Sequence, residues 1–124
     1  MKAKQDFFRI WLPPLFWSAF IFFLSSLSIN LQPKLNLIFI DKVAHFLIYL
    51  PLGFLVARAF YLSEVKSLRK YLVILTLGFC LLYAASDEIH QLFVYNREAS
   101  AADALFDIFG SAIGLFIFYF SKKG

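Results

Sequence analysis

Residues 71–91 read YLVILTLGFCLLYAASDEIHQ, an uncharged apolar run of 16 residues that ends in a group of polar side chains. The polar group contains Asp87, Glu88, His90 and Gln91. Ionisable side chains at the end of a hydrophobic span are costly to hold against lipid, so they usually face protein, water or a ligand. The stretch therefore predicts a membrane-spanning helix with a polar site at its end.

Two other apolar stretches begin with polar residues of the same kind. Asp41, Lys42 and His45 open one of them, and Asp103 and Asp107 open the other. Asp41 and His45 are four residues apart, as are Asp103 and Asp107, and this spacing places each pair on one face of a helix. Polar groups at three span ends indicate one shared site.

The amino-acid composition indicates whether the protein folds in water or in a lipid bilayer. Hydrophobic residues make up 61% of the 124 residues and charged residues only 16%, whereas soluble domains carry roughly a quarter charged residues. A helix needs about 20 residues to cross the hydrocarbon core of a bilayer. We therefore predict an all-α, polytopic membrane protein that forms a single domain over residues 1–124. Its bundle has four transmembrane helices, near residues 8–28, 42–62, 70–93 and 101–121.

The basic residues predict the orientation of this bundle. Nine of the twelve lie on one side of the predicted membrane, and six of the eight acidic residues lie on the other. Because Lys and Arg concentrate in cytoplasmic segments, we expect an inner-membrane protein with both termini in the cytoplasm and an outward-facing polar site. The nine are Lys2, Lys4, Arg9, Arg58, Lys66, Arg69, Lys70, Lys122 and Lys123.

A stripe of small residues predicts the direction in which the last polar pair points. Gly110 and Gly114 follow Asp103 and Asp107 on the same helical face. Small residues four apart allow a neighbouring helix backbone to come close in a membrane. The stripe is therefore expected to face the bundle interior, which takes both aspartates away from lipid.

Several separated positions carry a resemblance to a known family. They are DKVAHF (41–46), Tyr49, Leu52, Gly53, DEIHQLF (87–93), Arg97, Asp103, Asp107 and Gly110. Over residues 41–115 the chain resembles the VanZ-like family of small bacterial membrane proteins. The resemblance implies a four- or five-helix inner-membrane protein of the cell envelope, and the founding member is linked to low-level teicoplanin resistance. The chain departs from the family pattern at Tyr95-Asn96, where a Pro-Gly turn often precedes the arginine.

One hypothesis makes the polar groups a binding or catalytic site for a lipid-linked or cell-wall-related ligand. His45 or His90 would act as general acid or base, oriented by Asp41 or Asp87 one helical turn away. Arg97, with Lys42, would hold a phosphate or carboxylate, because a guanidinium fork matches those oxygens. The candidate catalytic residues are His45, His90, Asp87 and Glu88. The candidate ligand-binding residues are Asp41, Lys42, Gln91, Arg97, Asp103 and Asp107.

Two alternatives stay open. In the first, Arg97 and Lys42 pair with the nearby acids in a structural network that only ties the helices together. In the second, the excess negative charge is taken up by a divalent metal that is held by His45, His90 and some of Asp87, Glu88, Asp103 and Asp107. No other cofactor is expected. The partners are membrane lipids and, under the ligand hypothesis, a lipid-linked cell-wall precursor; no soluble basic domain exists to bind nucleic acid. Whether the protein is an enzyme, and its oligomeric state, do not follow from the sequence.

Overall fold

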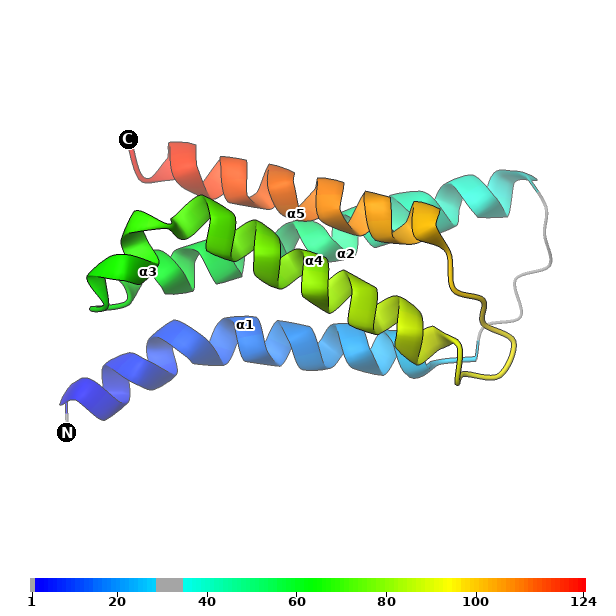
Figure 1. Cartoon of the computed structure of the whole chain (residues 1–124), viewed down its shortest axis with the longest axis horizontal. Coiled ribbons are helices and arrows are strands. Elements are labelled where there is room, and N and C mark those ends of the chain that lie inside the picture. Colours follow the sequence, from blue (N-terminus) through cyan, green and yellow to red (C-terminus); the bar gives the residue numbers. More distant parts are fainter. Residues whose placement is uncertain (1, 29–34) are drawn as a thin grey trace.

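The computed structural model describes residues 2–28 and 35–124, which contain five α-helices and no strand. The helices are α1 (Lys2–Ser26), α2 (Leu35–Leu62), α3 (Lys66–Lys70), α4 (Leu72–Gln91) and α5 (Ala101–Ser121). All but the short α3 are long and apolar enough to cross a membrane, and they lie side by side along the long axis of the molecule (Figure 1). The predicted all-α membrane bundle is confirmed.

The helix boundaries differ most from the prediction at the first two helices. Helix α5 begins and ends at the predicted residues, and α4 lies within the predicted range. Helix α1 begins at Lys2, and α2 begins at Leu35 rather than at residue 42. The prediction placed helix boundaries at charged residues, but charged residues are also compatible with the interior of a helix. Asp41 and Lys42 therefore lie inside α2, one to two turns from its start.

Helices α2 and α5 form the closest pair in the bundle. Their contact is lined by glycines: Gly110 lies against the backbone of Phe46, and Gly114 lies against that of Leu50. Gly53 of α2 lies in the same way against the backbone of Ser111. A Cβ atom at any of the three glycines would overlap the neighbouring backbone. The expected packing role of the small residues is confirmed, and it holds the whole α5 stripe against α2.

The core lies around α2. Tyr49, Leu52 and Val56 of α2 are buried with Ile21 of α1 and Cys80 of α4. The outer surface is apolar instead of charged, as expected for helices that face lipid. Its exposed side chains include Phe16, Phe23, Ile74, Leu82, Leu105 and Phe116.

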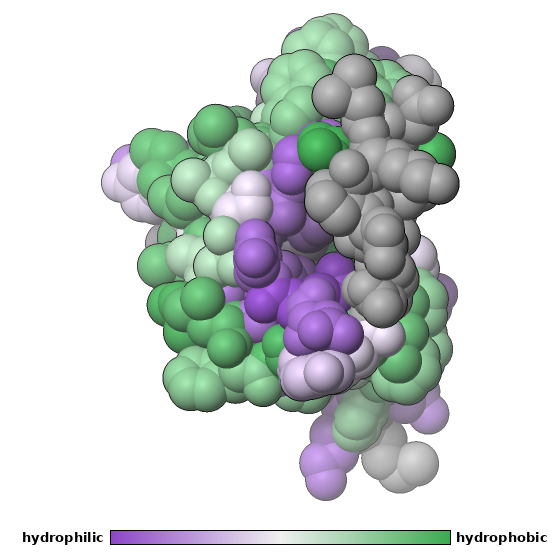
Figure 2. Space-filling view, turned by 90° about the vertical axis from the view of Figure 1, so that its right-hand side faces the viewer, coloured by the Kyte–Doolittle hydropathy of each residue, from purple (hydrophilic) through white to green (hydrophobic). Residues whose placement is uncertain are grey.

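The two ends of the bundle differ in charge. Both termini and α3 lie at one end, and the connection from α4 to α5 lies at the other (Figure 1). The terminal end carries the basic residues of α3 and of the C-terminal tail, including Arg69 and Lys122. At the opposite end, polar side chains gather in the middle of the visible surface, with apolar side chains above them and to their left (Figure 2). The predicted polar groups therefore lie at this end.

Candidate functional site

The start of α5 fixes two of the predicted acids. Ser100 is the N-cap residue, with extended backbone angles, and its hydroxyl accepts a hydrogen bond from the Asp103 N–H at 3.3 Å. A serine at this position satisfies a free N–H group of the first turn. The carboxylate of Asp103 also lies where the positive end of the helix dipole favours negative charge. One turn later, Asp107 projects from the same face toward α2.

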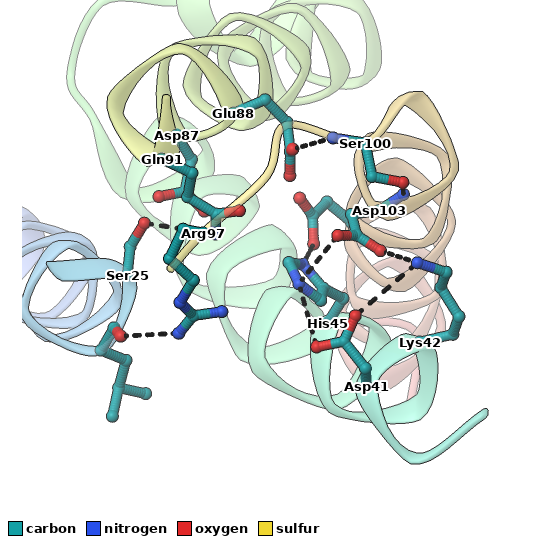
Figure 3. A network of polar contacts seen from close by, with 12 residues as sticks. Ser25, Asp41, Lys42, His45, Asp87, Glu88, Gln91, Arg97, Ser100 and Asp103 are labelled. Carbon is teal, nitrogen blue, oxygen red and sulfur yellow. Dashed lines mark hydrogen bonds and ion pairs between the residues drawn. The ribbon is translucent and has the colours of Figure 1, made fainter. Parts of the chain in front are cut away.

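Five of the predicted residues form what we call the α2–α5 polar cluster (Asp41, Lys42, His45, Asp103 and Asp107). The Lys42 ammonium is bonded to Asp103 and lies 3.6 Å from the Asp41 carboxylate. The His45 Nδ1 atom lies 2.8 Å from Asp107 Oδ1. Its other ring nitrogen, Nε2, lies 3.6 Å from Asp103 and 3.8 Å from Asp41. Side chains of two helices thus converge on one imidazole (Figure 3).

Glu88 reaches this cluster from α4. One carboxylate oxygen, Oε2, accepts a hydrogen bond from the Ser100 N–H at 2.7 Å. The other, Oε1, is buried without a hydrogen-bond partner among the described residues, and Asp107 Oδ2 is in the same state. The Asp107 side chain is fully buried, and Glu88 is 8% exposed. Buried polar atoms without partners are rare, so these two oxygens need an explanation.

Asp87 faces a different neighbour from Glu88. Its Oδ2 atom accepts a hydrogen bond from the Tyr49 hydroxyl at 3.2 Å, and both side chains are buried. Tyr49 was not among the predicted site residues, although it follows Asp41 and His45 at the same spacing of four. That periodicity is the sequence signal which could have identified it.

His90 and Gln91 lie against α1, away from His45. The His90 Nε2 atom is 2.9 Å from the Ser26 hydroxyl, and the ring stacks on Phe22 with centroids 4.5 Å apart. Gln91 donates to the Ser25 hydroxyl at 3.4 Å. The structure therefore does not unite the two imidazoles in one site. The physical reason is rotation: residues 88 and 90 are two apart, or about 200° around a helix axis, and face opposite neighbours.

Arg97 also binds α1, through backbone carbonyls. Its Nε atom donates to the Leu27 carbonyl at 3.0 Å, and Nη2 donates to the Leu24 carbonyl at 3.4 Å. These carbonyls lie at the C-terminal end of α1, where a cation is favourable. Within the described residues Arg97 makes no ion pair with a carboxylate. The expected pairing of Arg97 with the acids is thus not part of the structure.

The turn before Arg97 accounts for the departure from the family pattern. The Arg97 N–H donates to the Val94 carbonyl at 3.1 Å, which closes a four-residue turn. Asn96 has a φ of 60° in this turn. Glycine adopts that left-handed conformation readily, and asparagine is among the few other residues that tolerate it. Asn96 can therefore occupy the position at which a glycine often stands.

A cavity of about 240 Å³ separates the α2–α5 polar cluster from the residues that bind α1. It lies among α1, α2 and α4. The apolar lining residues are Ile21, Leu24, Ile40, Ala44 and Ile48, and the polar ones are Ser25, Asp41, His45, Tyr49, Asp87, Gln91 and Arg97. The predicted site residues that do not meet directly, such as His45 and Arg97, thus line the same space (Figure 3).

Two groups of three side chains have the composition and spacing of metal ligands. One is Asp41, His45 and Asp103, and the other is His45, Glu88 and Asp107. In each group the potential ligand atoms lie within 4.8 Å of one another. Neither group contains His90 or Asp87, which the sequence had offered as ligands.

The fold and site define a class: a multi-pass membrane protein in which polar side chains of several spanning helices converge at one end of the bundle. The model of the VanZ/LLP1 family matches residues 3–122. The chain therefore belongs to the VanZ/LLP1 family, as its resemblance to VanZ-like proteins implied. No curated protein and no solved structure matches the chain in the same comparisons.

Proposed function

We propose that this protein binds a lipid-linked ligand of the bacterial cell envelope in the cavity among α1, α2 and α4. The observation that carries the proposal is the lining of that cavity, in which apolar side chains of α1 and α2 meet charged and hydrogen-bonding groups of α1, α2 and α4 and Arg97. Small-molecule sites typically combine an apolar enclosure with a few placed polar groups. A prenyl or acyl chain would pack against the apolar lining residues, and a polar headgroup would bind the polar ones.

Arg97 is the cation that this cavity offers to an anionic headgroup. Two of its N–H groups bind carbonyls of α1, which fixes the position of the guanidinium. A guanidinium has five N–H donors, so others stay available to a phosphate or carboxylate. We infer that Arg97 binds the headgroup and that Gln91, which also lines the cavity, assists it.

His45 is the group best placed to move a proton on such a ligand. It lines the cavity, and its Nδ1 atom lies 2.8 Å from the Asp107 carboxylate, which orients the ring. An imidazole oriented by a carboxylate is a common general acid or base. His90, held by Ser26 and Phe22 outside the cavity lining, is assigned a role in anchoring α1.

We further propose that the cavity opens to the extracytoplasmic side of the inner membrane. The basic residues at the end with both termini favour a cytoplasmic location for that end. The opposite end, with the polar groups, then meets the compartment in which lipid-linked cell-wall precursors are used. Binding of such a precursor would connect the protein to glycopeptide susceptibility, the phenotype of the founding VanZ-like protein.

Replacement of Arg97 tests ligand binding directly. Native mass spectrometry of the detergent-purified protein with a polyprenyl phosphate should show a bound lipid, and Arg97→Ala should weaken it by about 1.5–3 kcal/mol, the range for a charged hydrogen bond. Arg58→Ala is the matched control. Arg58 lies near the C-terminal end of α2, at the opposite end of the bundle from Arg97, so this variant should leave binding unchanged. Teicoplanin susceptibility can be compared between cells that express the two variants. Cells with the R97A variant should be as susceptible as cells without the protein, and cells with the R58A variant should match the wild type.

A structural role for the polar groups is the second candidate. The contacts of Lys42 with Asp103 and of His45 with Asp107 do join α2 to α5. If this were their whole role, the polyprenyl phosphate would bind the wild type and the R97A variant alike, or neither. That result would overturn the ligand proposal.

A further inference from the structure

Two buried carboxylate oxygens between the helices, at the polar end of the bundle, have no hydrogen-bond partner among the described residues. They are Oε1 of Glu88, on α4, and Oδ2 of Asp107, on α5. Glu88 points from α4 into the space between the helices, toward His45 (Figure 3). A buried carboxylate is costly unless it is paired, coordinates a metal or takes up a proton. Among the described residues, no side chain therefore donates a hydrogen bond to either of these two oxygens.

Lys42 does not supply that partner. Its ammonium is within ion-pair distance of Asp41 and Asp103, on the other side of the imidazole. Within residues 4–28 and 38–124, no lysine or arginine forms an ion pair with Glu88 or Asp107. The two candidate metal-binding groups therefore differ. The group of Asp41, His45 and Asp103 already contacts the Lys42 ammonium, whereas the group of His45, Glu88 and Asp107 contacts no lysine or arginine among these residues.

We propose that His45, Glu88 and Asp107 bind one divalent cation. Their potential ligand atoms lie within 4.8 Å of one another, and they come from three different helices. The cation would coordinate the two unpartnered oxygens and neutralise the excess negative charge. It would also join α2, α4 and α5 at one point, beside the cavity that His45 lines.

The donor set indicates the kind of cation. One imidazole nitrogen with two carboxylates suits a first-row transition ion such as Zn²⁺ or Mn²⁺, whereas Mg²⁺ and Ca²⁺ take oxygen ligands. The surroundings of His45 match a metal ligand as well, because its other nitrogen, Nε2, faces the carboxylates of Asp103 and Asp41. Metal-bound histidines commonly have a carboxylate at the nitrogen that does not bind the ion.

The test is metal stoichiometry of the full-length protein in detergent. The protein is stripped with chelator, reloaded with Zn²⁺ or Mn²⁺, desalted and measured by mass spectrometry for metals. We expect one ion per chain from these two metals and none from Mg²⁺ or Ca²⁺ under the same conditions. Glu88→Gln and Asp107→Asn keep the shape of each side chain and should each weaken binding by more than about 100-fold, beyond the effect of losing an outer partner.

Asp41→Asn is the matched comparison, because it removes a carboxylate near His45 that is not a ligand in the proposed site and that lies beside Lys42. This variant should still bind one ion, with an affinity loss of no more than about 100-fold. Binding that survives both E88Q and D107N, or that D41N abolishes, would overturn the assignment.

A second readout covers variants that do not fold. Reloading the stripped wild-type protein should raise its Tm, because a ligand that binds only the folded state stabilises it. No bound metal and no shift in the wild type would mean that protons neutralise the two carboxylates, and would refute the site. The cation site and the headgroup contact of Arg97 use different residues, so metal binding can fail while polyprenyl phosphate binding that depends on Arg97 persists, and the reverse. An ion bound at the Nδ1 atom of His45 would replace the proton-transfer role proposed above for that ring.

Discussion

Lys42 illustrates how a single charged residue is accommodated within a spanning helix. Its side chain is 19% exposed, and it is held between the carboxylates of Asp41 and Asp103. Removing one member of a buried pair leaves the other charge without compensation, which costs more than the pair itself contributes. The energetic role of Lys42 is therefore to neutralise Asp103, which is only 8% exposed.

This role predicts non-additive mutations. Lys42→Met should lower the free energy of unfolding in mixed micelles by about 3 kcal/mol, because Asp103 loses its cation. The double variant Lys42→Met/Asp103→Asn should recover about half of that loss, since no unpaired charge remains. Lys66→Met, on the exposed surface of α3, serves as the control and should have little effect. Additive losses in the double variant would contradict the ion pair.

At the scale of the elements, the glycines of α2 and α5 determine where the acids point. Gly110 and Gly114 are pressed against the α2 backbone, and Asp103 and Asp107 share their face of α5. A change in this contact would rotate or displace the helix and move both carboxylates away from His45. The polar cluster thus depends on residues that carry no polar side chain.

A pair of glycine substitutions tests this dependence. Gly114→Val should prevent stable packing of α5, because its side chain would overlap the backbone of Leu50 and Phe54. Gly78→Ala is the control: nothing lies within 4 Å of the added Cβ, and alanine favours the helix by up to about 1 kcal/mol. Thermal unfolding of the purified variants measures both effects. Equal stability of the G114V variant and the wild type would contradict the close contact of α2 and α5.

The sequence predicted the positions of the helices better than it predicted which side chains of different helices lie together. The uncharged runs placed α4 and α5 well, because hydrophobic length sets a spanning helix. The spacing of four correctly grouped Asp41 with His45 and Asp103 with Asp107. It could not assign Glu88 and His90 to different neighbours, because periodicity gives the faces of one helix and not which helix lies against each face. The unpartnered oxygens of Glu88 and Asp107 likewise emerge only from packing.

At the scale of the whole molecule, the bundle is polarised in charge. The end with both termini is basic, and the opposite end carries the polar cluster, the bridges to α1 and the cavity between them. Helix α1 closes one wall of that cavity and is fastened there by Ser25, Ser26 and the carbonyls that Arg97 binds. The proposed binding of a lipid-linked cell-wall precursor requires that this end meets the extracytoplasmic compartment.

Labelling of an introduced cysteine in intact cells tests that requirement most directly. In a Cys80→Ala background, Ala44→Cys places a thiol in the cavity lining, and Ala59→Cys places one on the same helix at a fully buried position. A membrane-impermeant maleimide added outside should label the A44C variant and leave the A59C variant unlabelled. Labelling of A44C only after the cytoplasmic face is exposed, or to no greater extent than A59C, would contradict an outward-opening cavity.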